Sequence, residues 1–87
     1  MDLTAFDRHV RALGQDPRDA ACLDWPVDVF FPTAGEDVEV AKRVCSGCEL
    51  REACLDYALT HGERWGIWAG TSERERRRMR RALKAVA

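Results

Sequence analysis

The residues best able to do chemistry are four cysteines in the spacing C-x22-C-x2-C-x5-C. They are Cys22, Cys45, Cys48 and Cys54, and the last three fall within ten residues. Thiolates are the ligands of structural zinc and of iron–sulfur clusters. Four cysteines in a chain of 87 residues, three of them so close together, are too concentrated for ordinary core packing. The spacing therefore predicts that the four thiols hold one metal centre.

The spacing also bears on the occupant of this centre. Four thiolates suit a tetrahedral zinc, but zinc modules usually use two paired C-x2-4-C knuckles, and this chain has one. Iron–sulfur clusters often take three close thiolates and one remote thiolate. An iron–sulfur cluster is therefore favoured over zinc, and both are favoured over disulfides or free thiols. His9 and His61 are further candidates, but each lies near a helix end or surface, and four thiolates already complete a set.

Hydrophobic periodicity predicts the elements that position the cysteines. Four helices are expected, over residues 2–14, 35–45, 49–62 and 71–87. No stretch alternates with period two over more than a few residues. We therefore expect one small all-α domain of about four helices, spanning residues 1–87 and organised around an iron–sulfur cluster. We expect residues 1–70 to form its cluster-binding body and residues 71–87 to form a basic C-terminal helix.

The predicted helices must break between Cys45 and Cys48. Cys48 and Cys54 lie about 240° apart around an ideal helix, so one straight helix cannot direct all three clustered thiols at one point. Ser46-Gly47 supplies the break. Cys22 lies in the proline- and aspartate-rich segment 15–35, an ordered loop too long to stand alone. A metal ligand at Cys22 would tie this loop to the helices.

The charge of the chain is divided between its two parts. The formal net charge is −1, but residues 1–70 carry a balance of −6 and residues 71–87 one of +5. Seven cations in eleven residues predict phosphate contacts, with affinity that falls steeply with salt. The expected DNA-binding residues are Arg76, Arg77, Arg80, Arg81 and Lys84. No Asn or Gln stands among them to read adenine, so we expect them to position DNA rather than to read its sequence.

Two local patterns mark the C-terminal helix. Ser72 and Glu75 form a capping box at its start. Met79, Leu83 and Val86 form a narrow apolar stripe along it.

The rest of the composition predicts a cytoplasmic protein without a membrane partner, because no apolar run approaches a membrane span and the N-terminus lacks a signal peptide.

The cysteine spacing is followed by Gly66-Ile67-Trp68-Ala69-Gly70 and then by the basic segment. In this order, over about residues 17–85, the chain resembles the WhiB-like (Wbl) family of actinobacteria and their phages. The resemblance implies a transcription regulator that carries a [4Fe–4S] cluster on Cys22, Cys45, Cys48 and Cys54 and senses nitric oxide or oxygen. It also implies binding to the C-terminal region 4 of the primary sigma factor within RNA polymerase.

The sigma-binding residues expected on this basis are Trp68, Phe30, Phe31, Gly66, Ile67 and Gly70. Two alternatives stand beside this expectation: Trp68 as core filler under a tight turn, and both phenylalanines buried as loop staples. The family turn usually reads G-[VI]-W-G-G, whereas this chain has Ala69 at the fourth position. Because alanine adopts a positive φ less readily than glycine, either the turn needs no left-handed residue there or its geometry is altered.

Two other functions compete. A zinc-stapled DNA- or protein-binding module would use the same four thiols. A protein disulfide reductase would use Cys45-Ser46-Gly47-Cys48, but such sites usually accompany a βαβ pattern, which this chain lacks. We therefore expect a regulator that is not an enzyme and has no small-molecule substrate. After cluster loss, the four thiols could pair as disulfides in three connectivities.

Overall fold

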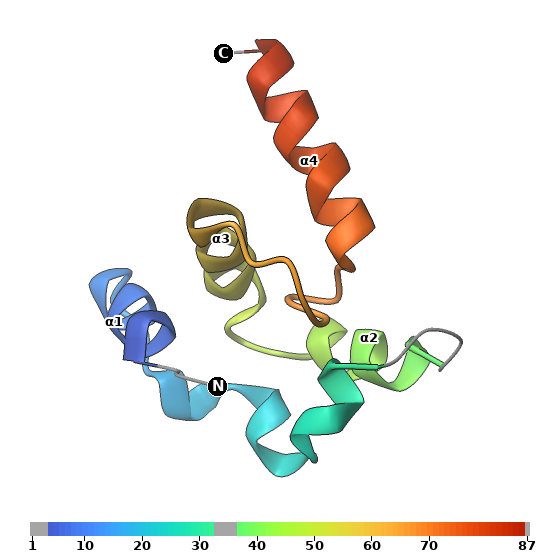
Figure 1. Ribbon diagram of the computed structural model, residues 1–87. Coiled ribbons are helices and arrows are strands. Elements are labelled where there is room, and N and C mark those ends of the chain that lie inside the picture. The colour runs from blue at the N-terminus through green and yellow to red at the C-terminus, as the bar shows by residue number, and fades with distance from the viewer. Residues whose placement is uncertain (1–3, 33–36, 87) are drawn as a thin grey trace.

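The computed structural model describes residues 4–32 and 37–86, and these form helices joined by short turns (Figure 1). The α-helices are α1 (Thr4–Ala12), α2 (Glu39–Ser46), α3 (Arg51–His61) and α4 (Glu73–Val86). Between α1 and α2 lie three 3-10 helices, η1 (Pro17–Asp19), η2 (Ala21–Asp24) and η3 (Val27–Phe30). In the described part of the chain the one β-type pairing is an isolated bridge between Trp68 and Thr71. The predicted small all-α fold is confirmed.

The main core lies between α1 and α3. Phe6 and Val10 of α1 pack against Tyr57 of α3, together with Leu50 and Trp68. The rings of Phe6 and Tyr57 meet edge to face, with centroids 5.4 Å apart. These contacts fix the helix that carries Cys54 against the N-terminal helix.

A second, smaller core joins α2 to the 3-10 helices. Ala41 and Cys45 of α2 pack with Phe30 of η3 and with Ile67. The backbone N–H of Ile67 also donates to the carbonyl of Phe30 at 2.7 Å. The turn around Ile67 is thereby attached to both α2 and η3.

The helix boundaries agree with the predicted ones to within a few residues. Gly47 caps α2, and Cys48 lies between α2 and α3, so the expected break is present. Gly62 ends α3 with a φ of 65° and donates its N–H to the carbonyl of Ala58. The predicted start of the second helix at residues 35 and 36 lies outside the described residues, and α2 begins at Glu39.

The segment between α1 and α2 is more regular than the ordered loop we predicted. It folds into three successive 3-10 turns, each closed by local backbone hydrogen bonds. Asp16 begins the first of them by accepting from the N–H of Arg18 at 2.9 Å. Short 3-10 turns let a proline-rich stretch change direction while most of its backbone groups stay hydrogen-bonded.

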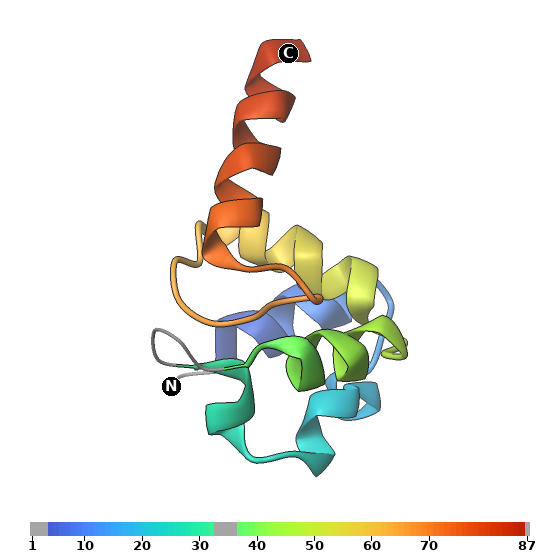
Figure 2. The ribbon, with the colours of Figure 1, turned by 90° about the vertical axis from the view of Figure 1, so that its right-hand side faces the viewer.

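Helix α4 projects away from the other helices, which Figures 1 and 2 show from two directions. The predicted capping box is confirmed: Ser72 N–H donates to Glu75 Oε1 at 3.0 Å, and Glu75 N–H donates to Ser72 Oγ at 3.2 Å. Glu75 also pairs with Lys42 of α2 at 2.8 Å. Within the described residues, no helix has both the length and the apolar character needed to cross a membrane.

Candidate metal centre

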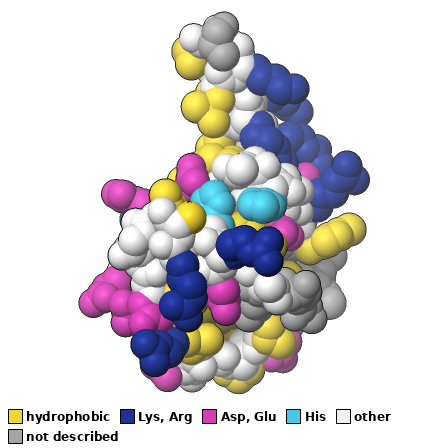
Figure 3. Space-filling model, turned by 90° about the vertical axis from the view of Figure 1, so that its left-hand side faces the viewer, with side chains coloured by type: hydrophobic (Ala, Val, Ile, Leu, Met, Phe, Trp, Pro, Cys, Tyr) yellow, Lys and Arg dark blue, Asp and Glu magenta, His cyan; other side chains and the backbone are white. Residues whose placement is uncertain are grey.

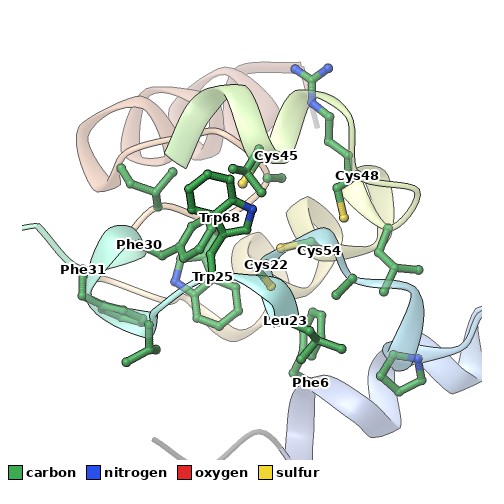
Figure 4. A pocket seen from close by; sticks show the side chains of 18 of the residues that line it. Phe6, Cys22, Leu23, Trp25, Phe30, Phe31, Cys45, Cys48, Cys54 and Trp68 are labelled. Carbon is green, nitrogen blue, oxygen red and sulfur yellow. The ribbon is translucent and has the colours of Figure 1, made fainter. Parts of the chain in front are cut away.

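The four cysteines come from three helices and one connecting segment, and they line one cavity of about 300 Å³ (Figure 4). Cys22 lies in η2 and Cys45 near the end of α2, whereas Cys48 follows the Gly47 cap and Cys54 lies in α3. All four are free thiols. Residues 32 positions apart in sequence therefore share a single space, as the spacing predicted.

The other walls of the cavity are largely apolar. Figure 4 shows Trp25, Trp68 and Phe6 among the side chains around the sulfur atoms. Further lining residues are Pro17, Ala20, Leu23, Val27, Phe30, Phe31, Val44, Leu50, Ile67 and Ala69, with Asp7 and Arg51 as the charged members. Such a lining limits the access of water to whatever the thiols hold.

Burial works against ionisation of the free thiols. It raises the pKa of Cys22 and Cys45, and it raises that of Cys54 to about 12. A bound metal ion would lower these pKa values, because a metal ion stabilises the thiolates that bind it. The N–H of Ala21 also donates to Cys48 Sγ at 3.4 Å, so one thiol already has a backbone donor.

The turn at residues 66–70 supplies two more donors. The backbone of Gly70 acts to lower the pKa of Cys45, and that of Ala69 acts to lower the pKa of Cys54, although burial outweighs both effects. Amide groups directed at sulfur are a common outer shell of iron–sulfur sites. The turn thus faces the thiols with its backbone as well as with its side chains.

The same turn has strict backbone requirements. Gly66 has a φ of 86°, and a Cβ there would lie 2.6 Å from the Phe31 ring and 2.9 Å from the Phe30 carbonyl. Ala69 has a φ of 52° and Gly70 one of 73°. The left-handed conformation is therefore retained at Ala69, which answers the question that the alanine raised.

The residues present fit a metal centre held by four thiolates. Four thiols, from η2, α2, α3 and the connection between α2 and α3, surround an apolar space with backbone donors directed at them. Over residues 4–32 and 37–86, however, no three Cys, His, Asp or Glu side chains converge closely enough to hold a single metal ion. Four thiolates are the ligand set of a tetrahedral structural zinc and also of an iron–sulfur cluster.

The two histidines lie outside this cavity, between α1 and α3. His9 Nε2 lies 2.6 Å from Asp56 Oδ2. The ring of His61 stacks on Tyr57 with centroids 4.5 Å apart. Both histidines have partners of their own, in agreement with their omission from the ligand set.

The residues predicted to bind sigma are mostly buried. Trp68, Ile67 and Phe30 are 8%, 7% and 6% exposed and belong to the two cores. Phe31, Gly66 and Gly70 are half-buried. The structure therefore favours the alternative in which Trp68 fills the core, and it makes these residues the support of a surface rather than the surface itself.

Four large apolar side chains in or near this part of the molecule are exposed, and none of them is among the predicted sigma-binding residues. Leu23, Trp25 and Val27 line the cavity, yet about half of each remains exposed to solvent. Trp65 is 77% exposed and lies outside the cavity lining. Large apolar residues between Asp24 and Asp28, in a segment without helical periodicity, were the available signal for a surface of this kind.

The basic residues of α4 divide by exposure. Arg77, Arg81 and Lys84 are exposed, and Arg77 pairs with Glu73 at 2.7 Å. Arg80 is half-buried and has a buried Nη1 without a partner among the described residues. Figure 3 shows Lys and Arg side chains along one side of this helix and hydrophobic ones along the other.

Arg76 does not fit the predicted set of DNA contacts. Its side chain has no exposed surface, and its guanidinium donates to backbone carbonyls of the preceding turn. Burial and the neighbouring Arg80 lower its pKa. The assignment of Arg76 to DNA binding was wrong, because this position of α4 faces the body of the molecule.

Comparison with known proteins supplies the family. A model described as "Transcription factor WhiB" matches residues 17–79. The chain is 55% identical over 64 residues to the "Transcriptional regulator WhiB2" of Mycolicibacterium smegmatis, a match covering 74% of this chain and 50% of that protein. The chain thus spans about half the length of that relative.

Two further relatives are covered more fully. The WhiB2 regulator of Mycobacterium tuberculosis strain H37Rv is 52% identical over 64 residues, covering 74% of this chain and 72% of the relative. The WhiB regulator of Streptomyces coelicolor is 51% identical over 63 residues, covering 72% of each chain. These relatives are named as transcriptional regulators and not as enzymes. With the family match extending over most of its length, the chain belongs to the WhiB family of transcription factors.

Proposed function

We propose that this chain is a transcription regulator that holds a [4Fe–4S] cluster on Cys22, Cys45, Cys48 and Cys54. The observation that carries the proposal is the convergence of four free thiols, from three helices and the connection between α2 and α3, on one apolar cavity. When bound, the cluster supplies the redox chemistry and the reactivity towards nitric oxide or oxygen that a sensor needs.

A bound cluster would link segments of the chain that lie far apart in the sequence. Cys22 connects η2 to α2 and α3 through the shared site. The ligand thiols must lose their protons, so cluster binding releases protons. The free energy of binding also contributes to the free energy of folding. The apolar walls limit solvent access, and the donors at Ala21, Ala69 and Gly70 stabilise negative charge on sulfur.

The surface proposed for the primary sigma factor, region 4, lies at the mouth of this cavity. Leu23, Trp25 and Val27 form it as exposed apolar side chains, with half-buried Phe31 beside them. Trp68, Ile67 and Phe30 support it from beneath. Aromatic side chains in a desolvated centre dominate protein–protein affinity, so Trp25 is the principal candidate anchor.

DNA is assigned to the cationic side of α4. Arg77, Arg81 and Lys84 are exposed there, with Arg80 partly available. Long cationic side chains along a projecting helix suit contact with phosphates, which fixes orientation and carries little sequence information. Promoter choice would then come mainly from the sigma-bound polymerase.

The alternatives are less well supported. A zinc module would use the same four thiols, but zinc modules usually bind through two paired C-x2-4-C knuckles, and this chain has one. A disulfide reductase needs an accessible thiol of lowered pKa, whereas Cys45 is buried and its pKa is raised.

The deciding experiment is purification without oxygen, followed by an absorbance spectrum and assays of iron, sulfide and zinc. A brown protein with about four irons and four sulfides per chain is expected. A colourless protein with one zinc and no sulfide would overturn the cluster proposal and favour the zinc module. Capture of sigma region 4 by the iron-loaded protein then tests the second part.

A further inference from the structure

Arg76 is the one cation of α4 that is fully buried. Its neighbours Arg74, Arg77 and Arg78 are all exposed. A buried guanidinium is costly unless its donors are satisfied, so its placement calls for a specific explanation.

The guanidinium binds the chain at both ends of the cavity-lining turn. Its Nη2 donates to the carbonyl of Gly66, the first residue of the turn, at 3.0 Å. Its Nη1 donates to the carbonyl of Thr71, after the turn, and lies 3.3 Å from the Thr71 hydroxyl. Its Nε lies 3.4 Å from the carbonyl of Glu63. The planar fork of arginine thus connects the first turn of α4 to residues 63–71.

The other contacts of α4 with the described part of the body lie in its first two turns. Glu75 pairs with Lys42 of α2, and Met79 and Arg80 are half-buried. From residue 81 to residue 86 the side chains are exposed. The body therefore supports α4 near its N-terminal end, and the C-terminal end projects freely.

Because α4 is held near its start, a small change at Arg76 changes the direction of the whole helix. Eight residues separate Arg76 from Lys84, a distance of about 12 Å along the helix. A tilt of about 10° at Arg76 would displace Lys84 by about 2 Å, which is enough to lose a hydrogen bond to a phosphate.

The turn that Arg76 binds also reaches the thiols. Ile67, Trp68 and Ala69 line the cavity, and the backbone of Ala69 and Gly70 acts on Cys54 and Cys45. We propose that Arg76 is a positioning residue, which fixes the direction of the basic helix relative to the cysteine cavity. This inference rests on the proposed function only in assigning DNA to α4.

The test measures the direction of α4 in the full chain, purified without oxygen and with whatever metal it carries. Spin labels on a ketone-bearing amino acid replace Arg8 of α1 and Ala85 of α4, both exposed. Pulsed electron paramagnetic resonance then gives their distance distribution in the parent protein, Arg76→Met and Arg76→Lys. Arg78→Met, which removes an exposed cation from the same helix, is the matched control.

We expect Arg76→Met to at least double the width of the distribution, Arg76→Lys to widen it less, and Arg78→Met to leave it unchanged. Amide exchange in α1 and α3 should stay within about threefold of the parent in every variant. With sigma region 4 bound, Arg76→Met should weaken promoter binding tenfold or more. Without sigma it should change non-specific DNA affinity less than threefold, because the exposed cations remain.

An unchanged distribution in Arg76→Met would overturn the inference. So would loss of protection in α1 and α3 together with α4 in both Arg76 variants, because Arg76 would then be a general folding residue. If the parent protein binds neither sigma nor DNA, the proposed function fails, and the distance distribution alone still decides on the positioning role.

Discussion

At the scale of single residues, the turn around Trp68 depends on backbone conformations that side chains normally disfavour. Gly66, Ala69 and Gly70 all have positive φ, and this arrangement directs backbone donors at two thiols. An alanine in the left-handed region costs about 1–2 kcal/mol relative to its usual conformations. Retention of that conformation at Ala69 indicates that the surrounding contacts determine the turn.

Two glycines with positive φ separate the cost of the backbone conformation from the cost of steric contact. Gly66→Ala should destabilise the loaded protein by about 2–4 kcal/mol, because it adds a close contact with the Phe31 ring to the cost of a positive φ. Gly62→Ala should cost about 1 kcal/mol, since its φ is also positive but nothing lies within 4 Å. Anaerobic urea unfolding of the two variants provides the comparison. Equal losses would show that Phe31 moves aside freely.

The three tryptophans are predicted to behave differently. Trp25→Ala should weaken sigma binding by at least tenfold and leave iron content unchanged, because Trp25 is an exposed side chain at the cavity mouth. Trp65→Ala, also an exposed tryptophan, is the control and should change neither quantity. Trp68→Ala should lower both iron content and sigma binding, since Trp68 is part of the core. Iron assay and titration with sigma region 4 measure the two effects.

At the scale of elements, the Lys42–Glu75 pair joins α2 to the start of α4. Hydrogen bonds from Lys42 and from the Ser72 backbone lower the pKa of Glu75 from 4.5 to about 2. Because the folded pKa lies below the ordinary value, the carboxylate stabilises the protein fully above about pH 4.5. That contribution is lost as the pH falls towards 2.

This shift predicts a titration that can be followed directly. The side-chain carboxyl carbon of Glu75, observed by nuclear magnetic resonance, should titrate near pH 2 in the parent protein. In Lys42→Met the midpoint should move back towards 4.5, because the strongest hydrogen bond to the carboxylate is removed. Identical midpoints in the two proteins would contradict the pairing of α2 with α4.

The 3-10 segment between α1 and α2 should depend on the metal more than any α-helix. Its short turns bury few side chains, and Cys22 is its proposed link to α2 and α3. Removal of iron should therefore raise amide exchange over residues 17–31 by tenfold or more, with a smaller rise over α3. Hydrogen-exchange mass spectrometry before and after chelation measures both. Uniform loss of protection would point to global unfolding instead.

The elements also mark the limit of sequence reasoning. Periodicity located the four helices, and the capping box located the start of α4, because these signals are local. The spacing of the cysteines predicted that they would come together. The burial of Arg76 was not predictable, since its charge matches that of its neighbours and its partners are carbonyls of a turn. For Trp68, the type of residue suggested an exposed anchor, whereas the packing of α1 on α3 places it in the core.

At the scale of the whole molecule, the charge separation found in the sequence becomes a separation in space. The basic helix projects from an acidic body, so that its cations lie apart from most of the carboxylates. The radius of gyration is 12.7 Å, slightly above the roughly 12 Å expected for a compact chain of this length. The body can thus meet a protein while the helix meets DNA.

Salt dependence tests this division of surfaces. Arg81→Gln should reduce the slope of log affinity for DNA against log salt concentration by about 0.9, the effect of one lost phosphate contact. Arg8→Gln removes the same charge at an exposed position of α1 and should leave the slope unchanged. Fluorescence anisotropy over a range of salt concentrations gives both slopes. Equal slopes in the two variants would remove α4 from the DNA interface.

The exposed outer turns of α4 have a thermodynamic consequence. The side chains of residues 81–86 are all exposed in the described part of the chain, and short helices with little packing support are only marginally stable in water. Warming the free chain therefore melts these turns gradually, before the body unfolds. A ligand that binds these turns restores the melted helix, so the enthalpy of ligand binding becomes more negative as the temperature rises. Calorimetry would register this as a heat-capacity change larger than the buried contact area alone accounts for.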